Sequence, residues 1–172
     1  MKGWYFMLHR EFNGLFADIE RELRNLEAVA NEAVEILQNF SGKPSKAVIR
    51  ACGSILHDFY NGIEKIFERI ASEVDGGVPR GYDWHLQLLQ RMLSPIPDAR
   101  TPVIDAGLGE KLDEYMRFRH VFRHQYGFQL RWQLVKELID QLPQIHSSFV
   151  EQIRAFEQWL RTADEDKPTI ES

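Results

Sequence analysis

Apolar residues recur along most of the chain at alternating intervals of three and four positions. The first two stripes run from Phe12 to Phe40 and from Val48 to Val74, and the last runs from Val135 to Leu160. This period places the apolar side chains on one face of an α-helix, so the sequence predicts three long amphipathic helices. Pro143 lies inside the last stripe and should kink its helix, because proline removes one backbone hydrogen bond.

Two shorter helices are expected between the second and last stripes. Asp83 is a suitable N-terminal cap for a helix that carries Trp84 and Leu88. Residues 94–109 hold three prolines and two glycines and predict a loop, after which a helix is expected from about Glu110 to Tyr126. No segment alternates with a period of two. The sequence therefore predicts an all-α fold: an antiparallel bundle of about five helices in one domain, residues 1–161, followed by an acidic flexible tail, residues 162–172.

Composition and charge narrow the classes of function. The 172 residues and the hydrophobic content of 44% suit one globular domain. No apolar run approaches the roughly 18 residues of a membrane span, and the apolar run at residues 1–8 is too short for a usual secretion signal. Cys52 is the only cysteine, and its place on an apolar stripe indicates packing rather than nucleophilic chemistry. These features favour a cytoplasmic protein without a membrane partner. The net charge of −5 argues against a general nucleic-acid coat protein.

The charge is unevenly distributed along the chain. Residues 115–136 contain four arginines, one lysine and two histidines but no aspartate or glutamate, so this window carries +5 and the rest of the −5 chain carries −10. Any contact with nucleic acid must therefore be confined to a patch, and this window predicts its position. The residues expected to bind RNA phosphates are Arg117, His120, Arg123 and Arg131.

Within this window Arg119, His124 and Tyr126 have the spacing R-x4-H-x-Y. On an unbroken helix Arg119 and Tyr126 differ by about 20° and share a face, whereas Arg119 and His124 differ by about 140°. A site that uses both Arg119 and His124 therefore needs either a helix break near His124 or a second subunit. Gly127 is a natural helix terminator and favours a break. The other alternative is a dimer in which the second subunit completes the site.

These residue types suit RNA cleavage without a metal. A histidine accepts or donates a proton at neutral pH, an arginine holds phosphate oxygens through a fixed fork of donors, and a tyrosine stacks on a base or binds phosphate. Two alternatives are open. The basic side chains can be solvated or paired with acidic faces of other helices, and His120 with His124 has the i, i+4 spacing of two metal ligands. No carboxylate or cysteine is near in sequence to complete a metal site, so neither a metal nor another cofactor is expected.

The segment Phe118-Arg119 … His124-Gln125-Tyr126 resembles the signature of the HEPN superfamily and, within it, of the HepT-like toxins. Residues 60–64 and 126–128 are similar to weaker HepT-like patterns. The resemblance implies a metal-independent endoribonuclease that acts as a homodimer and is the toxin of a type VII-like toxin–antitoxin system. It implies that Arg119 and His124 are catalytic. It also implies that a minimal nucleotidyltransferase, the partner antitoxin, silences the toxin by transferring AMP to Tyr126.

Two positions depart from the pattern of that family. The residue after the motif arginine is often asparagine but is His120 here, and no acidic residue closely follows Tyr126. The intact Arg119, His124 and Tyr126 favour a ribonuclease toxin. The departures favour a second hypothesis, a non-catalytic helical module that binds a minimal nucleotidyltransferase or a nucleotide through the same basic patch. An unrelated helical adaptor is the third.

Overall fold

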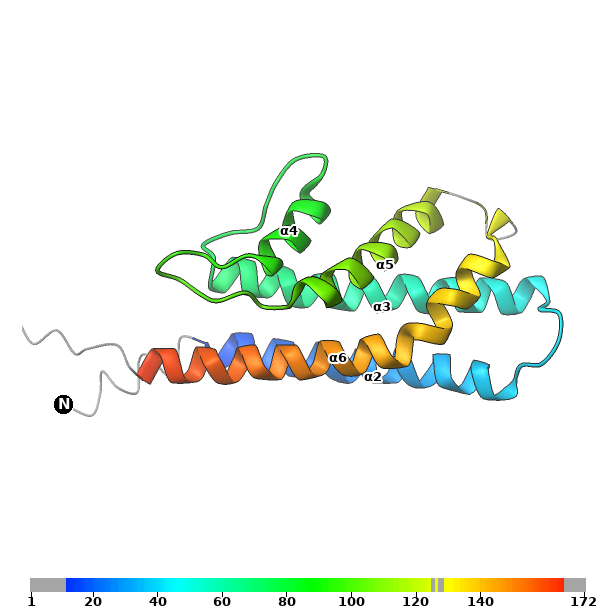
Figure 1. Cartoon of the computed structure of the whole chain (residues 1–172), viewed down its shortest axis with the longest axis horizontal. Coiled ribbons are helices and arrows are strands. Elements are labelled where there is room, and N and C mark those ends of the chain that lie inside the picture. Colours follow the sequence, from blue (N-terminus) through cyan, green and yellow to red (C-terminus); the bar gives the residue numbers. More distant parts are fainter. Residues whose placement is uncertain (1–11, 125, 127–128, 166–172) are drawn as a thin grey trace, which may run out of the picture.

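The computed structural model describes residues 12–124, 126 and 129–165, which form an elongated bundle of five α-helices (Figure 1). These helices are α2 (Asn13–Asn39), α3 (Lys46–Glu73), α4 (Trp84–Leu93), α5 (Ala106–His124) and α6 (Trp132–Glu165). The described residues contain no β-strand, only an isolated bridge between Ile96 and Arg100. The predicted all-α bundle is therefore confirmed. Among the described helices, none combines the length and the apolar character that a membrane crossing requires.

Helix α3 is the centre of the bundle because it contacts each of the other four helices. In Figure 1, α2 and α6 lie along one side of α3, and α4 and α5 lie on the other. The predicted apolar stripe of α3 forms the core, where Phe59, Ile63 and Ile66 have no exposed surface. Burying a side chain of this size stabilises the fold by about 1.5–3 kcal/mol. Cys52 is equally buried, as its predicted packing role requires.

A buried ion pair fixes α4 and the loop after it to the end of α3. The side chains of Arg100 and Asp75 are both inaccessible to solvent, and two Arg100 nitrogens donate to the two carboxylate oxygens at 2.6 and 2.8 Å. Further N–H groups of Arg100 donate to the backbone carbonyls of Arg91 and Ser94, each at 3.0 Å. A bidentate pair of this kind is strong and directional, so it holds the end of α4 against α3.

The start of α5 differs from the prediction. The helix begins at Ala106, inside the expected loop of residues 94–109, because Oδ1 of Asp105 accepts the backbone N–H of Leu108 at 2.8 Å and caps the first turn. Gly109 looked like a loop residue, but it lies where α5 packs against α4. A Cβ atom at Gly109 would clash with the side chain of Leu93, so the glycine permits close helix packing.

Other helix ends are closer to the prediction. Asp83 precedes α4 as expected, but its carboxylate accepts the side-chain amide of Gln87 at 2.6 Å instead of capping a backbone N–H. Helix α5 ends at His124, two residues before the expected end. Gln125, Gly127 and Phe128 lie outside the described residues.

Helix α6 continues through Pro143, and Figure 1 shows it bending in its first half, as the proline predicts. It extends to Glu165, so residues 162–165 belong to the helix rather than to the expected tail. The rest of that tail, residues 166–172, lies outside the described residues.

Candidate active site

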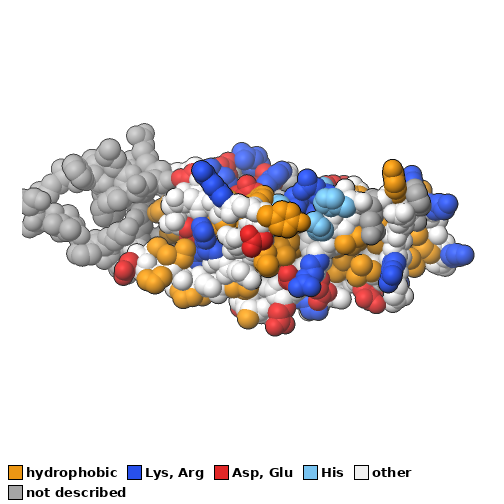
Figure 2. Space-filling view, turned by 90° about the horizontal axis from the view of Figure 1, so that it is seen from above, with side chains coloured by type: hydrophobic (Ala, Val, Ile, Leu, Met, Phe, Trp, Pro, Cys, Tyr) orange, Lys and Arg blue, Asp and Glu red, His pale blue; other side chains and the backbone are white. Residues whose placement is uncertain are grey.

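Helix α5 and the start of α4 enclose a cavity of about 550 Å³. Tyr82, His85 and Leu86 contribute to its wall from α4 and from the segment before it. Figure 2 views the molecule from this side and shows histidine next to lysine or arginine side chains near the middle of the face. The predicted site residues that line the cavity are Arg117, Arg119, His120, Arg123 and His124. Most of the basic patch expected from the sequence is therefore the wall of one cavity.

Arg119 and His124 reach this cavity from one helix, although they lie about 140° apart around its axis. Arg117, His120 and His124 have the i, i+3, i+7 spacing of one helical face. Arg119 lies about 100° from His120 around the axis, on the side of α5 that contacts Asn61 of α3. Helix α5 runs unbroken through both residues and ends at His124, so no break separates them. Both side chains nevertheless line the same cavity. One protomer therefore brings both motif residues to one cavity, and the homodimer stays a prediction.

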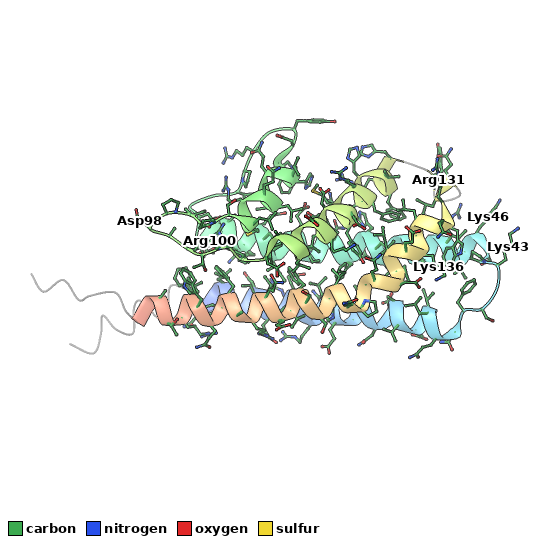
Figure 3. All side chains as sticks on the ribbon, in the orientation of Figure 1. Lys43, Lys46, Asp98, Arg100, Arg131 and Lys136 are labelled. Carbon is green, nitrogen blue, oxygen red and sulfur yellow. The ribbon has the colours of Figure 1, made fainter. Side chains whose placement is uncertain are left out.

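Tyr126 and Arg131 do not line this cavity. Tyr126 is two residues beyond the end of α5 and is 73% exposed. Arg131 lines a different cavity of about 400 Å³, together with Phe118 and Leu134. Figure 3 shows Arg131 at the end of the bundle where Lys43, Lys46 and Lys136 also lie. If Arg131 binds a phosphate as predicted, it does so on the surface outside the cavity that Arg119 and His124 line.

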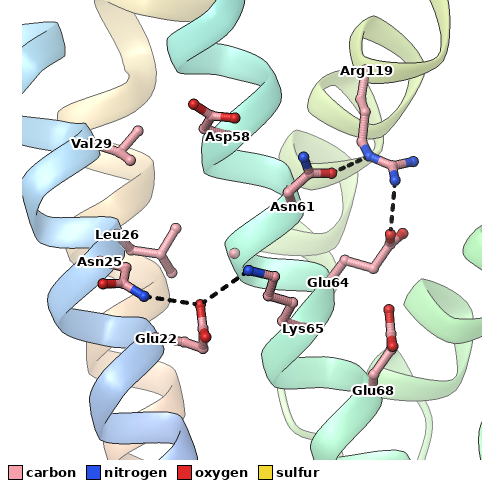
Figure 4. Close-up of a pocket in the computed structure, with 11 residues that line it drawn as sticks. Glu22, Asn25, Leu26, Val29, Asp58, Asn61, Glu64, Lys65, Glu68 and Arg119 are labelled. Atoms are coloured by element: carbon pink, nitrogen blue, oxygen red, sulfur yellow. Dashed lines mark hydrogen bonds and ion pairs between the residues drawn. The ribbon is translucent and has the colours of Figure 1, made fainter. Parts of the chain in front are cut away.

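Polar side chains of α3 hold Arg119 in place (Figure 4). Nε of Arg119 donates to Oδ1 of Asn61, and Nη2 lies 3.4 Å from Oε1 of Glu64. The side chains of Arg119 and Glu64 are only 13% and 6% exposed. Pairing with an acidic face of another helix, one of the two alternatives from the sequence, is thus confirmed for Arg119. Because a guanidinium has five N–H donors, these contacts leave others available to a phosphate.

Glu64 also holds a histidine of α4. Its Oε2 lies 2.5 Å from Nδ1 of His85, whose side chain is 26% exposed. A carboxylate can only accept, so Nδ1 of His85 carries the hydrogen. Glu64 therefore connects Arg119 of α5 with His85 of α4. One turn further along α3, burial and then the charge of Glu64 raise the pKa of the Glu68 carboxyl group.

The ring of His124 is oriented by its own helix. Nδ1 of His124 lies 2.7 Å from the backbone carbonyl oxygen of His120, and the two imidazole rings are 4.5 Å apart between centroids. The carbonyl only accepts, so Nδ1 is the donating nitrogen and Nε2 of the neutral ring keeps its lone pair. His124 is therefore set to accept a proton through Nε2.

The remaining arginines of the cavity are exposed. Arg117 forms an ion pair of 2.7 Å with Asp113 one turn back, but its side chain is 77% exposed and such a pair contributes little to stability. Arg123 makes no hydrogen bond or ion pair with other side chains in the described part of the chain. Both cations can therefore turn toward a polyanion without breaking a buried contact.

Asn61, Glu64 and His85 are site residues that were not among the predicted site residues. Asn61 and Glu64 lie in the segment 60–64 that resembles a weaker HepT-like pattern, and the sequence indicated for His85 only a contribution to a cleft. A signal for two of them exists, because α3 carries a polar stripe beside its buried apolar face. Its members follow one another at steps of four, three and four: His57, Asn61, Glu64 and Glu68. Nothing in the sequence pairs His85 with that stripe. Among the residues that the structure describes, no group of three or more His, Cys, Asp or Glu side chains is placed to hold a metal ion.

The model of the HepT-like protein family matches residues 51–160 of this chain. This segment is more than half of the chain and contains the cavity, the polar stripe of α3 and the R-x4-H-x-Y motif. The chain therefore belongs to the HepT-like protein family. Comparison with the curated proteins and with the solved structures gives no match.

Proposed function

We propose that this protein is a metal-independent endoribonuclease and the toxin of a toxin–antitoxin pair. The observation that carries this proposal is the cavity that both Arg119 and His124 line, with Arg119 held by Asn61 and Glu64. Membership of the HepT-like family supports the same function. A fixed guanidinium and an oriented imidazole in one cavity are suited to stabilise charge and to move a proton in phosphodiester cleavage.

The reaction uses the 2′-hydroxyl group of the RNA as its nucleophile. Nε2 of His124 takes the proton of this hydroxyl while the 2′-oxygen forms a bond to the adjacent phosphorus. The N–H groups of Arg119 bind the non-bridging oxygens as their negative charge grows. The bond between phosphorus and the 5′-oxygen then breaks, and the 5′-oxygen takes up a proton. The products are a 2′,3′-cyclic phosphate and a 5′-hydroxyl end.

The outer residues bind the strand and allow control. Arg117, His120 and Arg123 hold neighbouring phosphates at the cavity, and Arg131 extends this basic surface beyond it. Tyr126 is exposed near the end of α5, where a partner nucleotidyltransferase has access to its hydroxyl. Transfer of AMP to Tyr126 adds a phosphodiester anion next to these cations. That anion competes with RNA for Arg119 and Arg123 and silences the toxin.

A second function rests on one specific observation. Arg119 already pairs with Glu64, so its charge is partly compensated in the free protein. This arrangement suits a module that binds a nucleotide or a nucleotidyltransferase through the exposed Arg117 and Arg123 without cleaving RNA.

Growth and cleavage assays with one variant separate the two functions. Native protein should arrest growth on expression and cleave RNA in EDTA, whereas His124→Ala should lose on the order of 10²–10⁴ in cleavage rate. Arg24→Ala is the control, because Arg24 is exposed on α2 and pairs only with Glu20 at 3.8 Å among the described residues. Equal cleavage by native protein and His124→Ala would contradict the catalytic role, and no cleavage by either would favour the binding module.

A further inference from the structure

Cleavage of the P–O5′ bond requires a proton donor, and the motif histidine His124 can act on only one side of the reaction at a time. His124 has its Nδ1–H on a neutral carbonyl, which leaves Nε2 as an acceptor. The leaving 5′-oxygen needs a second group that holds a proton and faces the same cavity. Among the described residues, His85 and His120 are the other histidines in the cavity wall.

His85 has the geometry of such a donor. Its Nδ1–H is held by Oε2 of Glu64 at 2.5 Å, so the orientation of the ring is fixed by a side chain that is itself only 6% exposed. Nε2 has no hydrogen-bond partner within the described part of the chain, and it is not among the buried polar atoms without a partner. Nε2 therefore keeps some exposure to solvent, and His85 is one of the residues that line the cavity.

Carboxylates of α3 surround one side of the His85 ring. Glu64 contacts it directly, Glu68 interacts with it from the next turn of α3, and Arg119 stands on the far side of Glu64. His124 has only a neutral carbonyl at its Nδ1, and His120 contacts the ring of His124.

The geometry points to His85 as a second catalytic residue, the general acid that protonates the 5′-oxygen. This inference rests on the proposed ribonuclease function. In the step, the P–O5′ bond breaks, its electron pair goes to the 5′-oxygen, and the proton on Nε2 of His85 passes to that oxygen. His124 has meanwhile gained the proton of the 2′-hydroxyl. A transfer from His124 to His85 through water restores both rings, so no other reactant is needed.

The test compares two RNA substrates that differ at one atom. In the second substrate sulfur replaces the 5′-oxygen of the scissile bond. A thiol has a pKa of about 8.5, so its sulfur can leave as a thiolate without receiving a proton from the protein. His85→Ala should slow cleavage of the oxygen substrate by on the order of 10²–10⁴ and should cleave the sulfur substrate at close to the native rate. His124→Ala should be slow on both substrates, because the 2′-hydroxyl still has to lose its proton.

A second variant separates proton donation from structure. His85→Asn places an amide N–H where Nδ1 of His85 lies, so it keeps a donor for Glu64. The amide has no proton to give at neutral pH, so this variant should behave like His85→Ala. The proposal is overturned if His85→Ala cleaves the oxygen substrate at the native rate, if it is slow on both substrates, or if His120→Ala is the variant that sulfur restores. Native protein that cleaves neither substrate would instead refute the proposed ribonuclease function itself.

Discussion

Removal of Arg119 tests the centre of the site, because this residue has both a catalytic and a structural role. Arg119→Ala removes the donor to Asn61 and the positive partner of Glu64. Loss of one fixed donor to the transition-state charge should reduce the cleavage rate by about 10²–10³. After this change, the nearly buried carboxylate of Glu64 has only His85 as a hydrogen-bond or ion-pair partner among the described residues.

The structural cost follows from the burial of Glu64. A buried polar group that is left without a partner costs about 1–3 kcal/mol, and a charged group costs more. Glu64 keeps His85 as a second partner, so we expect a cost within that range. For a chain of this size each kcal/mol lowers the melting temperature by about 2–4 °C, so Arg119→Ala should melt several degrees below the native protein. Adding Glu64→Gln removes the stranded negative charge and leaves an acceptor for His85. The double variant should therefore regain stability without regaining cleavage.

The assay is single-turnover RNA cleavage at 25 °C, where all variants are folded, together with thermal unfolding by circular dichroism. Arg24→Ala is the matched control, since it removes an arginine that is 64% exposed on α2, and it should change neither measurement. Native cleavage by Arg119→Ala would refute the clamp role. Recovery of cleavage together with stability in the double variant would show that Arg119 acts only through the fold.

Three further predictions concern control, assembly and pH. Tyr126→Phe keeps the ring but removes the acceptor hydroxyl, so a cognate nucleotidyltransferase should no longer add about 329 Da per AMP in intact-mass spectra; additions on the phenylalanine variant would place the modification elsewhere. Light scattering at micromolar concentration should give twice the 20.2 kDa chain mass, and a monomer would count against the homodimer. Burial lowers the pKa of His146 below its ordinary value of 6.5, and its Nε2 is buried without a hydrogen-bond partner in the described residues. As the pH falls, the imidazole of His146 takes up a proton more readily in the unfolded chain than in the folded one, and this favours unfolding. The contribution of His146 to stability should therefore be complete above pH 6.5 and decrease as the pH falls below it. Urea unfolding at several pH values should show a weaker decrease for His146→Leu, and an unchanged decrease would assign it to other groups.

The helices were predictable from the sequence because their information is local. The stripes of α2, α3 and α6 repeat every three or four residues, and this period identifies a buried helical face wherever the helix packs. The bend in α6 likewise follows from a local feature, the proline at position 143. The start of α5 was missed because Gly109 has the same appearance in a loop as in a tight helix contact, and only the position of Leu93 distinguishes the two.

The candidate site, too, was predictable from the sequence only in its local features. The sequence by itself determined that Arg119, His120 and His124 lie on the same helix within a basic window, because the residue spacing fixes their angles around the helix axis in any fold. Only the tertiary structure decided that Glu64 bridges Arg119 and His85, and that Arg131 lines another cavity. Contacts between helices depend on their crossing and register, which arise from the packing of whole faces rather than from the spacing of a motif. For that reason the sequence located the motif, and the packing of α3 and α4 against α5 selected its partners.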